Sequence, residues 1–114
     1  MLRKFLTRCA SPLPLSALPN NPLLQGLDPP GRQRLQQDLA LLQQCRDLPE
    51  GWPEAAKVLV VQGEQDAIVC PESRTQLLQA LNMARTDHVF RPDEGHALVT
   101  PAVLDLVLRW SGHP

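Results

Sequence analysis

The sequence has no tyrosine, and it has only two tryptophans and two phenylalanines among its 114 residues. Aromatic platforms on which single-stranded bases stack are therefore not expected. The formal net charge of −1 provides no basic surface for a nucleic-acid backbone. No apolar run approaches the roughly 20 residues that a membrane-spanning helix needs. These absences predict a globular cytoplasmic protein whose partners include neither nucleic acid nor a membrane.

Cysteine is also scarce, with three widely spaced residues, Cys9, Cys45 and Cys70. No C-x-x-C pair occurs, so neither a disulfide framework nor a zinc site is expected. Reduced thiols in a cytosolic compartment are the simplest interpretation, and each cysteine is expected to be a small buried apolar residue. No motif indicates a metal or another cofactor.

The first half of the chain, residues 1–50, reads as helices joined by a proline-rich loop. In "MLRKFLTRC" apolar residues recur at i, i+3, i+4 and i+7 with basic residues on the other side, which predicts an amphipathic surface helix. A transit peptide is the alternative, because no acid precedes Asp28. Six of the twelve prolines fall within residues 10–31, which predicts a loop. Residues 32–46 then favour a helix, whose inner stripe would be Leu35, Leu39, Leu42 and Cys45.

From residue 51 onward the pattern alternates between strands and helices. "VLVV" after Lys57 is short, β-branched and continuously apolar, as in a strand buried on both faces of a parallel sheet. Residues 72–83 predict a helix, 87–91 a second strand and 101–110 a last helix. The expected inward residues of the two helices are Leu77, Leu78, Leu81, Val103, Leu106, Val107 and Trp110. Strand, helix, strand and helix in succession predict a parallel α/β sheet with right-handed crossovers.

An acid and an imidazole follow the two predicted strands. Asp66 lies three residues past Gly63, and His96 lies five residues past Arg91. Because functional side chains gather at the carboxyl ends of parallel strands, neighbouring strands would bring this pair together. The carboxylate would then fix the tautomer of the imidazole, which could act as a general base.

These two segments resemble the α/β-hydrolase family. "LVVQGEQDAIVCPE" is similar to the segment that carries the family's catalytic acid, and "GHAL" to its histidine loop. The resemblance covers about residues 56–111 and implies that Asp66 and His96 are the acid and base of a Ser-His-Asp triad. It also implies a small ester or acyl substrate near Val69, Ala97 and Leu98. Cys70 stands where the family usually has proline. Residues 1–50 resemble a helical lid, most like that of pimeloyl-carrier-protein methyl ester esterases.

The nucleophile of that family is absent. The six glycines are Gly26, Gly31, Gly51, Gly63, Gly95 and Gly112. No two are four residues apart, so neither a G-x-S-x-G elbow nor its cysteine variant exists in this sequence. An oxyanion loop is missing too, and Met1 is expected to fall inside the lid, after the point where the first strands of the family's sheet would have ended. The expected fold is therefore an incomplete domain: lid-like residues 1–50 and a partial hydrolase core over 51–114, inactive alone, with the missing half of the enzyme as its partner.

Other interpretations of the same residues remain open. An aspartate after a strand often caps a helix or forms a turn, and a Gly-His dipeptide is often structural. Asp93 and Glu94 are rival acids for His96, expected to be solvated in a polar loop. Asp28, Asp38 and Asp47 are expected to be surface or capping residues. The whole chain could instead be a non-catalytic remnant that pairs through its exposed sheet edge, or a binding protein that uses its lid helix and proline-rich segment.

Overall fold

The structure is a computed structural model that describes residues 2–20 and 26–112. In chain order its elements are α1 (Leu2–Ala10), the 3-10 turn η1 (Leu15–Ala17), α2 (Pro29–Gln44), β1 (Val58–Gly63), α3 (Pro71–Ala80), the 3-10 turn η3 (Met83–Arg85), β2 (Thr86–Arg91) and α4 (Pro101–Trp110). The alternation predicted from residue 51 onward is confirmed. Part of the predicted proline-rich loop, residues 21–25, lies outside the described residues. No helix in the described ranges is long and apolar enough to cross a membrane.

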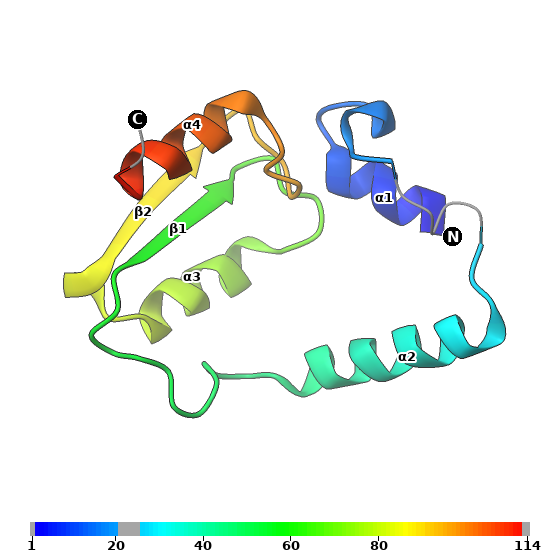
Figure 1. Ribbon diagram of the computed structural model, residues 1–114, viewed down its shortest axis with the longest axis horizontal. Coiled ribbons are helices and arrows are strands. Elements are labelled where there is room, and N and C mark those ends of the chain that lie inside the picture. Colours follow the sequence, from blue (N-terminus) through cyan, green and yellow to red (C-terminus); the bar gives the residue numbers. More distant parts are fainter. Residues whose placement is uncertain (1, 21–25, 113–114) are drawn as a thin grey trace.

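The sheet consists of β1 and β2, which run parallel in a register from Val58 opposite Thr86 to Gly63 opposite Arg91. Figure 1 shows α3 and α4 flanking this strand pair from two sides. The crossover from β1 to β2 passes through α3, as a parallel connection requires. The two strands therefore end at the same edge of the sheet, and the loops that follow them begin side by side.

Prolines and caps set the starts of the helices. Pro71 and Pro101 stand in the first turns of α3 and α4, where a missing N–H costs nothing. The side chain of Asp28 accepts a hydrogen bond from the Gly31 N–H at 2.8 Å, which confirms its expected capping role. This cap lets α2 begin at Pro29, three residues before the predicted start. Asp38 and Asp47 are exposed, as expected.

Helix α3 is shorter than predicted. It ends at Ala80, because a separate 3-10 turn follows in which the Asn82 side chain accepts a hydrogen bond from the Ala84 N–H at 3.0 Å. Leu81 is buried as predicted, whereas Leu77 is 40% exposed. In α4 the predicted inward face is likewise only partly covered: Val103 is buried, but Val107 and Trp110 are exposed.

The prediction that the apolar stripe of α2 is buried is wrong. No residue of this helix is buried, and Leu39 and Leu42 are 51% and 66% exposed. Figure 1 shows α2 well apart from the strand pair. An apolar stripe states only which face a helix could bury, and the described residues offer this face no surface to contact. The expected burial of the cysteines is similarly wrong for Cys45 and Cys70, which are exposed, and correct for Cys9.

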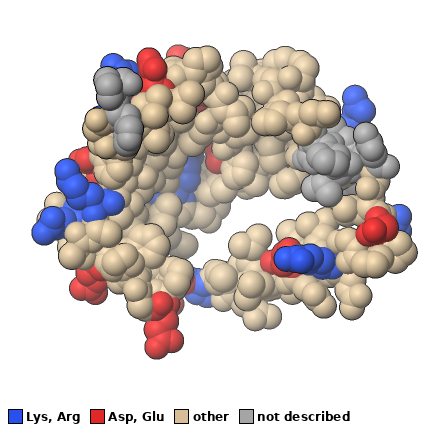
Figure 2. Space-filling view, in the orientation of Figure 1, with Lys and Arg blue, Asp and Glu red and all other residues tan. Residues whose placement is uncertain are grey.

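The chain as a whole is open. Its radius of gyration is 16.1 Å, whereas about 13 Å is typical of a compact domain of this length. Its accessible surface is 8865 Å², against roughly 6,200 Å² for a folded monomer of its mass. Figure 2 shows the atoms surrounding an open centre. The buried apolar residues among those described are correspondingly few: Cys9, Ala10, Val60, Leu81 and Val103.

Replacing Leu81 and Leu42 by alanine tests this distribution of burial. Leu81→Ala removes buried side-chain atoms just after α3 and is expected to lower the free energy of unfolding by about 2 kcal/mol. Leu42→Ala removes the same atoms from an exposed position and is expected to change it by less than about 0.5 kcal/mol. Chemical denaturation of the full chain, followed by circular dichroism, measures both. A loss at Leu42 as large as that at Leu81 would mean that α2 is covered.

Candidate active site

The site lies where β1 and β2 end, between two loops. We call residues 64–70 the acid loop and residues 92–100 the histidine loop. The Glu64 N–H donates to the Arg91 carbonyl at 2.9 Å, and the Gln65 N–H donates to the Glu94 carbonyl at 3.0 Å. The Gln65 side chain adds a bond to the Pro92 carbonyl at 3.1 Å. The loops are therefore joined to each other by backbone contacts before any functional side chain is considered.

Two glycines permit this close approach. A Cβ at Gly63 would lie 2.3 Å from the Gly95 carbonyl oxygen and 2.4 Å from that of Glu94. A Cβ at Gly95 would lie 1.7 Å from the Ser11 carbonyl oxygen, in the chain just after α1. No side chain fits either position without moving backbone. The glycine before His96 is thus required by its neighbours in space.

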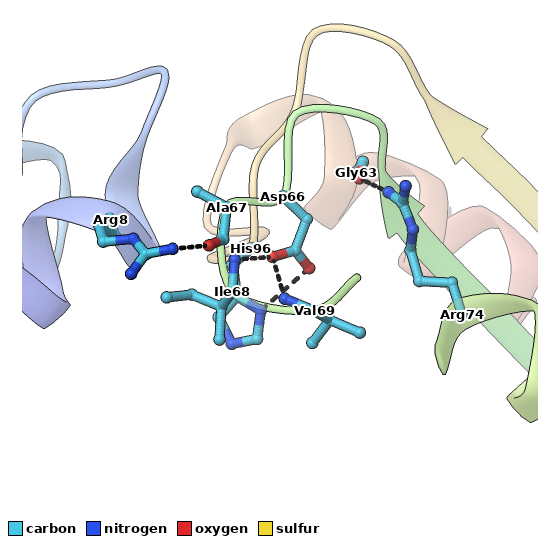
Figure 3. Close-up of polar contacts among 8 residues, drawn as sticks. All are labelled: Arg8, Gly63, Asp66, Ala67, Ile68, Val69, Arg74 and His96. Carbon is cyan, nitrogen blue, oxygen red and sulfur yellow. Dashed lines mark hydrogen bonds and ion pairs between the residues drawn. The ribbon is translucent and has the colours of Figure 1, made fainter. Parts of the chain in front are cut away.

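Asp66 and His96 meet between the loops (Figure 3). Nδ1 of His96 lies 3.1 Å from Oδ2 of Asp66. The other carboxylate oxygen, Oδ1, accepts hydrogen bonds from the backbone N–H groups of Ile68 at 2.8 Å and Val69 at 2.9 Å. The Asp66 side chain is 9% exposed and that of His96 is 37% exposed. The juxtaposition predicted from the strand ends is present, with the aspartate inside and the imidazole facing outward.

The surroundings of Asp66 favour its charged form. Burial alone would raise the pKa of this carboxyl, but the hydrogen bonds from Val69, Ile68 and His96 outweigh it, and the pKa lies below its ordinary value. A carboxylate only accepts hydrogen bonds, so in neutral His96 the hydrogen sits on Nδ1 and Nε2 keeps its lone pair. Within the described residues Nε2 has no hydrogen-bond partner. The geometry therefore leaves a basic nitrogen directed away from Asp66.

The rival acids do not bond to His96. Asp93 is exposed, as expected. Glu94 is not solvated, contrary to the prediction: it is 6% exposed, and its carboxyl accepts a hydrogen bond from the Thr100 hydroxyl at 2.7 Å. The hydrogen bond joins two residues of the histidine loop that lie six positions apart, so the loop brings Thr100 back to Glu94. Of the three candidate acids, only Asp66 forms a hydrogen bond with His96.

The residues predicted to line the substrate site stay near this pair. Val69 belongs to the acid loop, and Ala97 and Leu98 follow His96; all three are partly exposed. Val69 contributes its N–H to Asp66, and Ala97 donates its N–H to the Cys9 carbonyl at 3.0 Å. Their contact with a substrate remains a prediction. Among the described residues, no group of three or more histidine, cysteine or acidic side chains could hold a metal ion.

Two arginines at the site were not singled out from the sequence. The Arg8 guanidinium donates from Nη2 to the Ala67 carbonyl at 2.7 Å. Arg74 of α3 donates to the carbonyl of Gly63, and its guanidinium lies 5.3 Å from the centre of the Phe90 ring. Figure 3 shows both reaching the acid loop and the end of β1 from helices on either side. Nothing local signals the first contact, because 59 residues separate its partners.

Comparison of the chain with protein-family models, with curated proteins and with solved structures found no match. The functional assignment therefore rests on the two sequence motifs and on the geometry of the Asp66–His96 pair.

The lowered pKa of Asp66 predicts a specific pH dependence. The unfolded carboxyl has a pKa of about 3.9, so the stabilisation is fully present above that pH and is lost as the pH falls through the lower folded pKa. Asp66→Asn is expected to flatten the acid limb of the unfolding free energy between about pH 5 and 2. Asp93→Asn, an exposed substitution in the histidine loop, is the control and should leave the limb unchanged. Identical limbs for the wild type and Asp66→Asn would contradict the assignment.

Proposed function

We propose that this chain is the C-terminal part of an α/β-hydrolase-type serine hydrolase and supplies the acid and the histidine of its triad. The observation that carries the proposal is the 3.1 Å contact between Asp66 and His96, formed by loops at the carboxyl ends of two neighbouring parallel strands. The order of acid before histidine and the motifs around both residues support the same assignment. Esterases acting on pimeloyl-carrier-protein methyl esters are the subfamily that the lid-like residues favour.

The roles of the two side chains follow from their hydrogen bonds. Nε2 of His96 would accept the proton of a serine hydroxyl as that oxygen attacks an ester carbonyl. Asp66, held by two backbone N–H groups, would keep the hydrogen on Nδ1 and stabilise the imidazolium that forms. His96 would then return the proton to the leaving alcohol, and water would later release the acyl group by the same route.

The serine and the oxyanion donors would come from outside these 114 residues. The sequence has no G-x-S-x-G, so the missing half of the hydrolase must lie on a preceding segment or on another chain. The pair alone would lack the nucleophile it activates and the donors that stabilise the oxyanion, which are among the largest contributions to catalysis. The substrate of the assembled enzyme would be a small ester or acyl compound.

A second candidate, a non-catalytic interaction module, is favoured by the free edge of β1. Its residues Val58–Val61 carry no charge, and in the described part of the chain only β2 pairs with this strand. β2 carries Asp87, His88 and Arg91, which suit an edge strand. A partner strand would therefore add to β1, with main-chain hydrogen bonds as the source of affinity.

Complementation of the full chain tests the catalytic proposal. The isolated chain is expected neither to hydrolyse a p-nitrophenyl ester with saturable kinetics nor to be labelled by a fluorophosphonate. It has no G-x-S-x-G motif and therefore no nucleophilic serine of that kind. The in-frame DNA upstream of Met1, or a neighbouring gene, is expected to encode a G-x-S-x-G segment. When the chain is joined to that segment, it should hydrolyse the ester and be labelled by the fluorophosphonate. In the joined protein, His96→Ala should lower kcat/KM for the ester by about 10³-fold or more.

Two results would count against the catalytic proposal. Joined-chain turnover that survives His96→Ala would exclude His96 as the base. An upstream region without an elbow motif, together with binding of the chain to a strand-donating partner, would favour the interaction module.

A further inference from the structure

Helix α1 contacts both halves of the Asp66–His96 pair. From one side, Arg8 Nη2 donates to the carbonyl of Ala67 at 2.7 Å (Figure 3). From the other, the Ala97 N–H donates to the carbonyl of Cys9 at 3.0 Å. Ala67 directly follows Asp66, and Ala97 directly follows His96. Two consecutive residues of one helix thus hold the residue next to each member of the pair.

The end of α1 lies against the histidine loop closely enough to exclude a side chain there. A Cβ on Gly95 would lie 1.7 Å from the Ser11 carbonyl oxygen and 3.3 Å from Cδ of Pro12. In α1 only Cys9 and Ala10 are buried, and both belong to this contacting end. The helix is therefore buried where it contacts the site, and its first two turns are largely exposed.

Electrostatics agree with this placement. Burial and then the negative charge of Asp66 raise the pKa of the Cys9 thiol, and the Arg8 guanidinium opposes that rise. Cys9 therefore lies within the field of both charged groups. Its raised pKa keeps the thiol protonated at neutral pH.

We propose that α1 is a positioning element of the site and that Arg8 is a positioning residue, which fixes the acid loop so that Asp66 stays aligned with Nδ1 of His96. The catalytic meaning of this role rests on the proposed function; the geometric role does not. The Ile68 and Val69 N–H groups bond Oδ1 only while the loop keeps its turn. Arg8 bonds the carbonyl of the Ala67–Ile68 peptide, and the N–H of that same peptide is one of the two donors. The contacts of Arg8 and Cys9 described above reach the two loops and not the paired positions of β1 and β2.

The experiment is NMR spectroscopy of the full chain and of three variants. Two readouts report the alignment: the pKa of the Asp66 carboxyl and the Nδ1–H proton signal of His96. Arg8→Ala is expected to raise the Asp66 pKa toward its ordinary value, to weaken the Nδ1–H signal through faster exchange, and to speed exchange of the Ala97 amide. Arg8→Lys keeps a cationic donor and should restore part of each effect. Arg3→Ala removes the same charge from an exposed position of α1 and should change none of them.

Three outcomes would overturn the proposal. In the first, Arg8→Ala leaves the Asp66 pKa and the Nδ1–H signal unchanged. In the second, Arg3→Ala moves them as far as Arg8→Ala, which would indicate a general charge effect. In the third, Arg8→Ala also abolishes the amide signals of β1 and β2, which would make Arg8 a residue of global stability. Neither readout requires turnover, so a failure of the hydrolase proposal would appear separately, as an inactive joined enzyme with an aligned pair.

Discussion

The parallel pairing of β1 with β2, with no side chain at Gly63, determines where the functional groups of this chain lie. The register sets Gly63 opposite Arg91, so both strands end together and both loops start at one edge. The missing Cβ lets the histidine loop rest directly on the end of β1. Asp66 and His96 then need only a few residues of loop each to reach one another. Moving one strand by a single position would place Asp66 against a different part of the histidine loop.

Asp66 finds its hydrogen-bond partners within the chain, whereas Nε2 of His96 has no partner among the described residues. Asp66 has two backbone donors and an imidazole, and these lower its pKa despite burial. His96 is held through Nδ1, while Nε2 faces outward from a side chain that is 37% exposed. This asymmetry is compatible with the proposed general base, whose working nitrogen would have to meet a group supplied from outside.

Local sequence predicted the order of the helices and strands and the meeting of Asp66 with His96, though not the two 3-10 turns or the end of α3. Apolar runs and prolines mark β1 and α4, and the carboxyl-end rule for parallel strands needs no knowledge of packing. What failed depended on contacts distant in sequence. The solvation expected for Glu94 ignored the return of Thr100, and the contact of Arg8 with Ala67 leaves no local trace. The prediction that α2 is buried assumed a packing partner for its apolar face, and an apolar stripe does not say whether such a partner exists.

The proposed function gives the open surface and the absent nucleophile one common explanation. The accessible area of 8865 Å² exceeds that of a compact monomer by roughly 2,600 Å², whereas a standard interface buries only about 800 Å² on each partner. A transient partner would leave most of the excess uncovered. The remainder of a parallel sheet would cover far more, because it would pair with the free edge of β1 and supply apolar surface on both faces. Under the proposed function, the half of the hydrolase that would cover this surface is also the half that would carry the nucleophile, so one missing segment would account for both the open surface and the absent nucleophile.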